Sequence, residues 1–402
     1  MIPTQEMKPV LISVYTMTSC LGRGVAATRA SFLSASSGLA PCTFETADLD
    51  THVGEIGGLD AVAIPAALKR FDCRNNRASE LGLAQDGFAE AVAEAAARYG
   101  ADRAGVFIGT STAGILQTEL AYRRRDPQTG ALPADFDYRG THNTFSAAEF
   151  VRERLALRGP CVAVSTACSS SAKAFAAAAR MLNTGLIDMA VVGGVDTLCL
   201  TTLHGFASLQ LLSRAPCRPY DAERDGISIG EAAAFFLLTR DAHDGSIALL
   251  GTGESSDAHH MSAPHPDGLG ARRAMEAALA TAALTPDAID YLNLHGTGTT
   301  INDAAEDTAV HGVFRDTVPV NSTKGMTGHT LGAAGAVEAA IAMLAIEERR
   351  IPDSPGTRRV DPLLHARYEA TGRPGDIGCV MSNSFGFGGS NCSLVFGRLG
   401  AR

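Results

Sequence analysis

The stretch CVAVSTACSSSAKAFAAAARMLNTG, residues 161–185, decides the fold. Its valine-rich start predicts a buried strand, and the small residues that follow predict a tight turn. The alanine-rich run from Ser171 predicts a helix, which Gly185 ends. A strand that leads directly into a helix is the repeating unit of layered α/β proteins. The stretch therefore predicts an α/β fold.

A second stretch, VPVNSTKGMTGHTLGAAGAVEAAIAML at residues 318–344, repeats the pattern of strand, small-residue turn and alanine-rich helix. Five predicted strands in each part of the chain occur in a similar order. They are Val10–Tyr15, Ala104–Gly109, Cys161–Ser165, Met189–Val195 and Ala232–Leu238, then Ile247–Gly251, Tyr291–Leu294, Val318–Asn321, Gly378–Ser382 and Cys392–Phe396. We expect an internal duplication with halves at 1–243 and 244–402. The alternative is that any α/β protein repeats such units.

A polar stretch inside the first half, at about 115–147, predicts a cap inserted outside the layers.

Composition and charge exclude several classes of protein. Hydrophobic residues make up 46% of the 402 residues, which suffices for an extensive core and excludes a disordered chain. Lys and Arg number 34 against 43 Asp and Glu, and the net charge of −9 argues against a general polyanion binder. Aromatic residues are scarce, with no Trp. We therefore expect no nucleic-acid partner.

The cysteines and the N-terminus bear on the cellular compartment. The nine cysteines show no CxxC pair, which argues against both a disulfide framework and a zinc framework. Residues 1–15 lack the pattern of a signal peptide, and no window reaches the ~18 apolar residues of a membrane span. We expect a soluble, cytoplasmic protein with no membrane span.

Cys168 lies where the predicted strand meets the predicted helix. A thiol there meets unpaired backbone N–H groups and the positive end of the helix dipole, and both favour the thiolate. Its small neighbours, among them Ala167 and Ser169, leave room for a substrate and permit a tight turn. A buried structural cysteine is the alternative, and the other eight cysteines keep that interpretation. We predict that Cys168 is a nucleophile.

Two histidines follow predicted strands of the second half. His295 opens the turn HGTGT, and His329 precedes an alanine-rich helix. Both lie beyond the carboxyl ends of strands, where α/β folds bind ligands. Lys324 could bring a positive charge to the same cavity and Glu306 could orient Lys324, although a surface ion pair is the alternative. No HxxxH or HxxE spacing supports a metal site, so we expect no metal.

The segment SNSFGFGGSNC, residues 382–392, is a glycine-rich turn between two predicted strands. Phe385 and Phe387 could close over an apolar substrate. A phosphate-binding loop is the competing interpretation, but no GxxxxGK[ST] occurs and the segment leads into a strand. We expect no nucleotide site here.

Four motifs together resemble the elongating β-ketoacyl-[acyl carrier protein] synthases. They are TACSSS (166–171), HGTGT (295–299), KGMTGHTLGAAG (324–335) and NSFGFGGSN (383–391). SGLAP (37–41) and RPYDAERDG (218–226) are also similar, so the resemblance covers nearly the whole chain. It implies the thiolase fold: two duplicated halves in a five-layered αβαβα core, usually a dimer.

The resemblance also implies a reaction. Cys168 takes an acyl group from the phosphopantetheine thioester of an acyl carrier protein. Malonyl carrier protein then loses CO₂ beside His295 and His329, and the carbanion attacks the acyl group to give a β-ketoacyl product. Neutral imidazoles suit this role, and the backbone N–H groups of Cys168 and Phe387 would bind the oxyanion. No cofactor is implied beyond the phosphopantetheine that carries the substrates.

Further residues are assigned through the resemblance. Lys324 and Glu306 join the catalytic set, and Thr297, Thr299 and Phe385 the substrate contacts. Thr112, in GTSTAGI at the end of the acyl pocket, stands where a bulkier residue would shorten the cavity and so bear on chain length, unless it only packs at a dimer interface. The candidate docking residues for the acidic carrier protein are Lys69, Arg70, Arg74 and Arg124, although the run Arg123–Arg125 could equally be a solvated charged face.

Relatives on the same fold remain as alternatives. Initiating synthases carry His and Asn, and thiolases carry a second Cys, whereas this chain has two histidines. A CoA-dependent thiolase-like acyltransferase and a silent subunit stay open, although Cys168 argues against the silent subunit. We expect a homodimer or a heterodimer with a related ketosynthase or chain-length factor.

Departures from the family pattern bear on the pathway. HGTGTTIND stands where many relatives read HGTSTPxGD, Ile227 replaces a frequent aromatic residue after RDG, and Ser390 replaces Thr. These put housekeeping fatty-acid synthesis in doubt. The stretch DFDYRGTHNTF (135–145) resembles synthases of specialised pathways such as aryl polyene assembly. Acyl chain length and unsaturation do not follow from the sequence.

Overall fold

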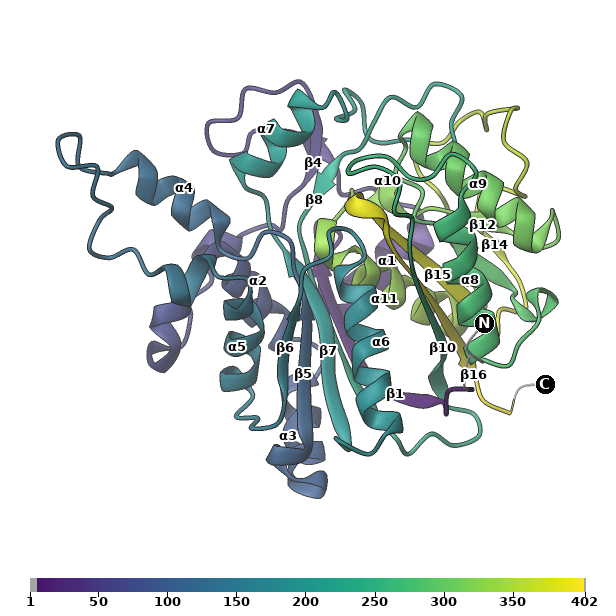
Figure 1. Ribbon diagram of the computed structural model, residues 1–402, viewed down its shortest axis with the longest axis horizontal. Helices are drawn as coiled ribbons and strands as arrows, with labels where there is room; N and C mark the ends of the chain where they lie inside the picture. The colour runs from purple at the N-terminus through teal and green to yellow at the C-terminus, as the bar shows by residue number, and fades with distance from the viewer. Residues whose placement is uncertain (1–5, 401–402) are drawn as a thin grey trace.

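In the computed structural model, which describes residues 6–400, the strands form a mixed sheet with two equivalent halves (Figure 1). The N-terminal half contains β1 (Val10–Ser19), β5 (Ala104–Gly109), β6 (Cys161–Val164), β7 (Met189–Asp196) and β9 (Ala232–Thr239). The C-terminal half contains β10 (Ile247–Ser256), β11 (Tyr291–Asn293), β12 (Val320–Asn321), β15 (Cys379–Gly386) and β16 (Ser390–Arg398). All ten predicted strands are present, with small differences at their ends. Residues 1–5, where the N-terminal prediction begins, lie outside the described residues.

The two halves share both strand order and strand direction. The first half runs β6-β5-β7-β9-β1 and the second β12-β11-β15-β16-β10, so corresponding strands occupy corresponding places. In each half, one strand pairs in parallel with two neighbours and the remaining pairs are antiparallel. The halves meet where Val10 and Leu11 pair with Leu249 and Ala248. The repeated topology confirms the predicted duplication.

Helices form three layers around the two half-sheets. The helices are α1 (Gly24–Ser34), α2 (Arg74–Leu83), α3 (Phe88–Tyr99), α4 (Ile115–Arg123), α5 (Phe145–Arg154), α6 (Ser170–Asn183), α7 (Leu200–Ser208), α8 (Leu269–Thr281), α9 (Thr300–Phe314), α10 (Lys324–Thr327) and α11 (Ala334–Glu347). Helices α2, α3 and α5 cover the outer face of the first half, and α8 covers that of the second with α9 beside it. Helices α6 and α11 contact each other and strands of both halves, so they form the middle layer. This is the five-layered αβαβα arrangement of the thiolase fold.

Burial on both faces explains the strand sequences. Strands β5 and β7 are buried along their whole length and read as continuous apolar runs. Small residues let the helices approach closely: a Cβ at Gly109 would lie 2.2 Å from the backbone nitrogen of Ser171 in α6. The largest apolar cluster lies in the middle layer, where the ring centroids of Phe175 and Phe236 are 4.9 Å apart.

The cap begins with α4, which projects with its following loop from one side of the layered body (Figure 1). Helix α5 starts at Phe145 and packs on β5 and β6, so residues 145–147 of the predicted cap belong to the core. The domain boundaries themselves stay a prediction. The remaining short strands are β2 (Gly22–Arg23), β3 (Ala40–Pro41), β4 (His52–Gly54), β8 (Ile229–Gly230), β13 (Arg350–Ile351) and β14 (Arg373–Pro374). Within residues 6–400, no helix combines the length and apolarity that crossing a membrane requires.

Candidate active site

Cys168 lies in the short turn between β6 and α6, and its side chain is buried. The preceding residue, Ala167, has φ +53°, a left-handed conformation that a non-glycine residue adopts rarely and that marks strained turns at functional sites. The turn is held by two bonds: the Thr166 N–H donates to Ser170 Oγ at 2.9 Å, and Ser169 Oγ donates to the Thr166 carbonyl at 2.9 Å. The turn thereby fixes the thiol at the start of α6.

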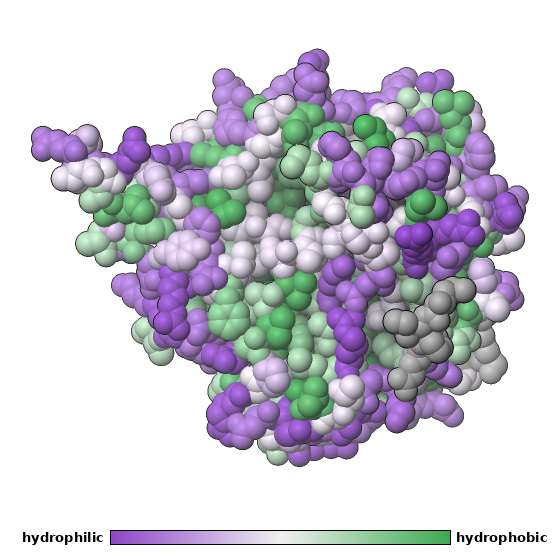
Figure 2. All heavy atoms as spheres, viewed as in Figure 1, coloured by the Kyte–Doolittle hydropathy of each residue, from purple (hydrophilic) through white to green (hydrophobic). Residues whose placement is uncertain are grey.

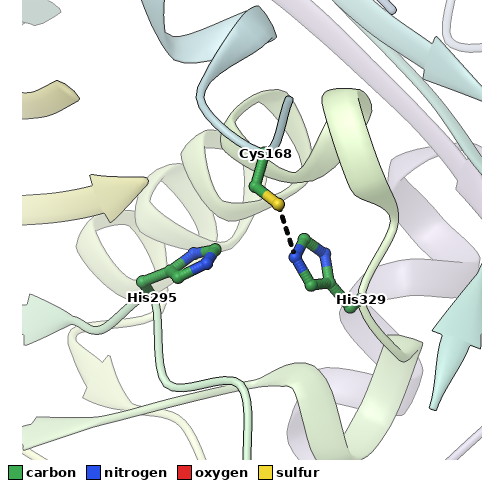
Figure 3. Close-up of side chains that lie close together, drawn as sticks. All are labelled: Cys168, His295 and His329. Carbon is green, nitrogen blue, oxygen red and sulfur yellow. Dashed lines mark hydrogen bonds between the residues drawn. The ribbon is translucent and has the colours of Figure 1, made fainter. Parts of the chain in front are cut away.

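The structure brings Cys168, His295 and His329 together from both halves of the chain. His329 Nε2 lies 3.0 Å from Cys168 Sγ, and one nitrogen of each imidazole and the sulfur all lie within 4.8 Å of one another. The two imidazoles stand edge to face, with centroids 5.2 Å apart and planes at 83°. Figure 3 shows the sulfur directed at His329 with His295 alongside. One substrate carbonyl can therefore reach all three side chains.

The tautomer of His329 follows from its second nitrogen. The backbone N–H of Leu331 donates to His329 Nδ1 at 3.1 Å, so in the neutral ring the proton is on Nε2. His329 thus donates a hydrogen bond toward Cys168 and the cavity. One cysteine and two histidines at this spacing could hold a soft metal ion, which the sequence spacing did not indicate. A metal would need the lone pair at Nε2 that the proton occupies, so the site is built to donate hydrogen bonds.

Burial sets the protonation states of the three groups. Burial, and after it the positive charge of Lys324, lowers the pKa of both His295 and His329 well below the ordinary value, so both are neutral near pH 7. Burial raises the pKa of the Cys168 thiol to about 11, despite the opposing effects of Lys324 and of hydrogen bonds from the Phe387 and Cys168 N–H groups. Desolvation thus opposes a resting thiolate at the helix N-terminus, where the helix dipole favours one.

Lys324 lies behind His295, and its partner differs from the predicted one. Its ammonium forms a buried ion pair with Glu338 and donates to the His295 carbonyl oxygen. Glu306 does not contact Lys324; its carboxylate accepts the backbone N–H groups of His295 and Gly296 at 2.8 and 2.7 Å. Glu306 therefore holds the HGTG turn, and the prediction that it orients Lys324 is wrong.

Glu338 was missed, although a sequence signal existed. It is the single charged residue among the buried alanines and aliphatic residues of α11 before the helix end, and burial raises its pKa above the usual range. An isolated acid inside such a helix needs a buried cation.

A cavity of about 220 Å³ opens above Cys168 between the two histidines and the surface. Thr297, Thr299 and Phe385, predicted to contact substrate, line it, as does Phe387. Phe387 stands half-exposed, with its ring centroid 5.7 Å from that of Phe206. The cavity thus combines polar threonines with an aromatic wall.

Thr112 does not line this cavity. It is buried, and its hydroxyl and its backbone N–H both donate to the carboxylate of Asp196 at 2.8 Å. Asp196 also accepts the Gly332 N–H at 2.6 Å, so it ties the turn at Thr112 to the segment that follows His329. Sequence reasoning missed Asp196. A chain-length role for Thr112 stays a prediction.

The predicted docking residues separate into exposed and buried ones. Lys69 and Arg70 are exposed, and Arg124 is exposed on the cap, where it pairs with Asp135. Arg74 is only 4% exposed, and it bonds the buried carboxylate of Glu231 at 2.6 and 2.9 Å. The prediction that Arg74 meets a partner is therefore wrong, because this guanidinium neutralises a buried acid inside the fold.

Two family models match the sequence: the N-terminal domain of β-ketoacyl synthase over residues 7–244 and its C-terminal domain over residues 247–358. The mitochondrial 3-oxoacyl-[acyl-carrier-protein] synthase of Arabidopsis thaliana is 38% identical over 274 residues, which span 63% of this chain and 59% of that protein. The 3-oxoacyl-[acyl-carrier-protein] synthase 2 of Rhizobium meliloti is 36% identical over 318 residues, 73% of this chain and 74% of that protein.

Solved structures similar to this chain include a ketosynthase as well. The ketosynthase ApeO of Xenorhabdus doucetiae, solved in complex with its chain length factor ApeC, is similar with a TM-score of 0.88 and 37% identity, covering 97% of this chain and 98% of that one. The duplicated fold, with Cys168 from the first half and His295 and His329 from the second, defines a thiolase-fold protein. The chain belongs to the β-ketoacyl synthase family.

Proposed function

We propose that the protein joins an acyl group on Cys168 to the two-carbon unit of malonyl carrier protein, with loss of CO₂. The observation that carries the proposal is the meeting of a thiol with two neutral imidazoles, one of which directs its N–H at the sulfur from 3.0 Å. The curated relatives named above are 3-oxoacyl-[acyl-carrier-protein] synthases, which supports this reaction.

The first step is transfer of the acyl group. The sulfur of Cys168 attacks the thioester carbon and loses its proton to water, and the C–S bond to phosphopantetheine breaks, so that the released thiolate takes a proton from water. Because the pKa of Cys168 is raised, the thiolate forms only as attack proceeds, with the His329 N–H donating to it. The backbone N–H groups of Cys168 and Phe387, which already point at the sulfur, are placed to bind the oxyanion.

The second step forms the carbon–carbon bond. The carboxylate of the malonyl thioester leaves as CO₂, and its electron pair passes to the enolate, whose oxygen accepts hydrogen bonds from His295 and His329. The carbanion then attacks the acyl carbon, and the bond from that carbon to Cys168 Sγ breaks. Neutral imidazoles can stabilise the enolate without protonating it first. The scheme includes neither a metal nor a cofactor of the protein's own.

The partners belong to the same proposal. Phosphopantetheine is borne by an acyl carrier protein, and exposed Lys69, Arg70 and Arg124 are the candidate contacts for its acidic surface. Within residues 6–400, β6 pairs only with β5, so its other edge is an end of the sheet, and Val162 and Val164 are only partly covered. Figure 2 shows apolar surface over the region of β6. An uncovered strand edge of this kind favours pairing with another chain.

The second chain in this proposal has the same fold, as a homodimer or as a heterodimer of the kind that ApeO forms with its chain length factor. The stretch 135–145 favours a specialised polyene-type pathway over housekeeping fatty-acid synthesis, and the similarity to a ketosynthase that was solved with a chain length factor supports a specialised pathway. A cytoplasmic location is also proposed, because a reducing compartment keeps the thiol of Cys168 available for acylation.

The test combines purified protein with an acyl carrier protein charged with acyl and with malonyl groups. The proposal expects acyl-Cys168 on intact-mass spectra, then CO₂ release and β-ketoacyl carrier protein. Activity with CoA esters alone would instead identify a thiolase-like acyltransferase. If Cys168 stays unacylated both alone and with a co-expressed related chain, the protein is a silent subunit.

A further inference from the structure

The cavity above Cys168 has one wall that the reaction scheme does not use. Ile227 lies in this wall with Phe206 and Leu211, and its side chain is only 3% exposed. All three are apolar and line the same cavity as Cys168 and His329. The wall therefore bounds the space that a reacting acyl group must enter.

Hydrogen bonds and close packing hold the backbone around Ile227 beside the cavity. Its N–H donates to the Leu211 carbonyl at 2.8 Å, and its carbonyl accepts the Ser213 N–H at 2.8 Å. The preceding Gly226 has φ +152° and no space for a side chain, since a Cβ there would lie 2.4 Å from the Leu211 oxygen. The Gly226 N–H donates to Gly298, in the turn that His295 opens. Ile227 is thus held in register with the histidine turn.

The next residues link the wall to His329. Ser228 accepts the His329 N–H at 2.7 Å, and the Gly230 N–H donates to the His329 carbonyl at 3.0 Å. Ile227 is branched at Cβ, so its side chain is also stiff. A larger side chain at 227 could withdraw only by disturbing the histidine, and so it would project into the cavity.

Because the cavity is small, the size of the side chain at position 227 affects which acyl groups fit. About 220 Å³ is below the ~300–1,000 Å³ typical of small-molecule pockets, so each wall residue limits what fits. We infer that Ile227 is a specificity-determining residue, whose limited width admits acyl groups that are branched or carry a ring next to the thioester carbonyl. This inference rests on the proposed acylation of Cys168.

The test measures acylation of Cys168 by pantetheine thioesters, followed by intact-mass spectrometry. Hexanoyl is the straight probe, and 2-methylbutyryl and benzoyl are the wide probes. Wild-type protein takes up both kinds, and Ile227→Phe lowers the ratio of wide to straight acylation about tenfold or more. Ile227→Leu, which conserves volume, changes the ratio less than Ile227→Phe does. Leu186→Phe, at an exposed position outside the cavity wall, leaves the ratio unchanged.

The outcomes separate this inference from the proposed function. Wild-type protein that is not acylated by hexanoyl overturns both. Wild-type protein that takes hexanoyl but neither wide probe overturns the inference alone. An unchanged ratio in Ile227→Phe, with thermal unfolding near that of wild type, also overturns it. If Ile227→Phe fails to fold, Ile227→Ala decides, because the larger space should raise the ratio of benzoyl to hexanoyl acylation.

Discussion

The two halves of the molecule share the same arrangement of strand and helix but differ in the connection between them. Helices α6 and α11 each have 14 residues and follow corresponding strands, β6 and β12. In the first half only residues 165–169 separate strand from helix, and Cys168 is among them. In the second half residues 322–333 fill this place and include the short helix α10. Duplication thus preserved the scaffold while the connection changed.

The longer connection can position more functional side chains than the shorter one. A short turn at a helix start fixes one atom, which suits a nucleophile that must attack along one direction. The longer segment places His329 against Cys168 and sends Lys324 back to the His295 carbonyl and to Glu338. We interpret the first half as the support of the nucleophile and the second as the support of the groups that stabilise charge.

The largest expected effect comes from removing the nucleophile. Cys168→Ala should lower β-ketoacyl formation at least ~10³-fold, because no other group can hold the acyl chain. Cys168→Gln, which mimics an acylated thiol, should still release CO₂ from malonyl carrier protein. Cys42→Ala, which alters a half-buried cysteine outside the cavity, is the matched control. Full condensation by Cys168→Ala would contradict the assignment of the nucleophile to the first half. A Cys168→Gln variant that releases no CO₂ would contradict the assignment of the charge-stabilising groups to the second half.

Removing His329 should separate the two steps. His329→Ala is expected to retain acylation of Cys168 within about tenfold and to lose condensation by ~10²–10⁴-fold, because the enolate loses a hydrogen-bond donor. Single-turnover acylation and CO₂ release, measured on the same preparation, give the two rates. Equal losses in both steps would mean that His329 serves mainly the thiol and not the carbanion.

The buried pair in the second half should matter for stability as well as rate. Lys324→Met leaves Glu338 buried without a cation, and we expect a loss of ~3–5 kcal/mol in the free energy of unfolding, measured in urea. Lys324→Met with Glu338→Gln should recover most of this stability but not condensation, because His295 still lacks its neighbouring charge. Glu347→Gln, which removes a surface ion pair with Arg29, should cost below about 1 kcal/mol. Condensation restored in the double variant would make the pair merely structural.

These residues also show what sequence can predict. Cys168 could be located because the strand, the turn and the helix that place it are continuous in the chain. The partner of Lys324 could not, because Glu306 and Glu338 lie on different helices and only their packing decides which one faces the lysine. Arg74 was misassigned for a similar reason: its partner Glu231 lies 157 residues away. Burial by distant segments likewise determines the raised pKa of Cys168.

The pH dependence of alkylation tests that raised pKa. Because the pKa of Cys168 is about 11, the thiolate fraction should rise about tenfold per pH unit from pH 7 to pH 10. Iodoacetamide labelling of Cys168, followed by peptide mass spectrometry, should show the same slope. The eight other cysteines serve as internal references. A plateau below pH 9 would mean that the helix start holds a preformed thiolate, and that the short connection activates the nucleophile without help from the second half.

The smallest expected effect concerns the surface. Lys69→Ala should weaken binding of the acyl carrier protein by a few-fold, because one exposed charge in an interface contributes ~1 kcal/mol or less. It should leave the urea unfolding curve unchanged. Arg74→Ala should instead lower the free energy of unfolding by ~3–5 kcal/mol, because it leaves the buried carboxylate of Glu231 without its cation. Calorimetric titration and unfolding of both variants separate a docking residue from a structural one. Weaker docking by Arg74→Ala in fully folded protein would contradict the structural role assigned to this buried guanidinium.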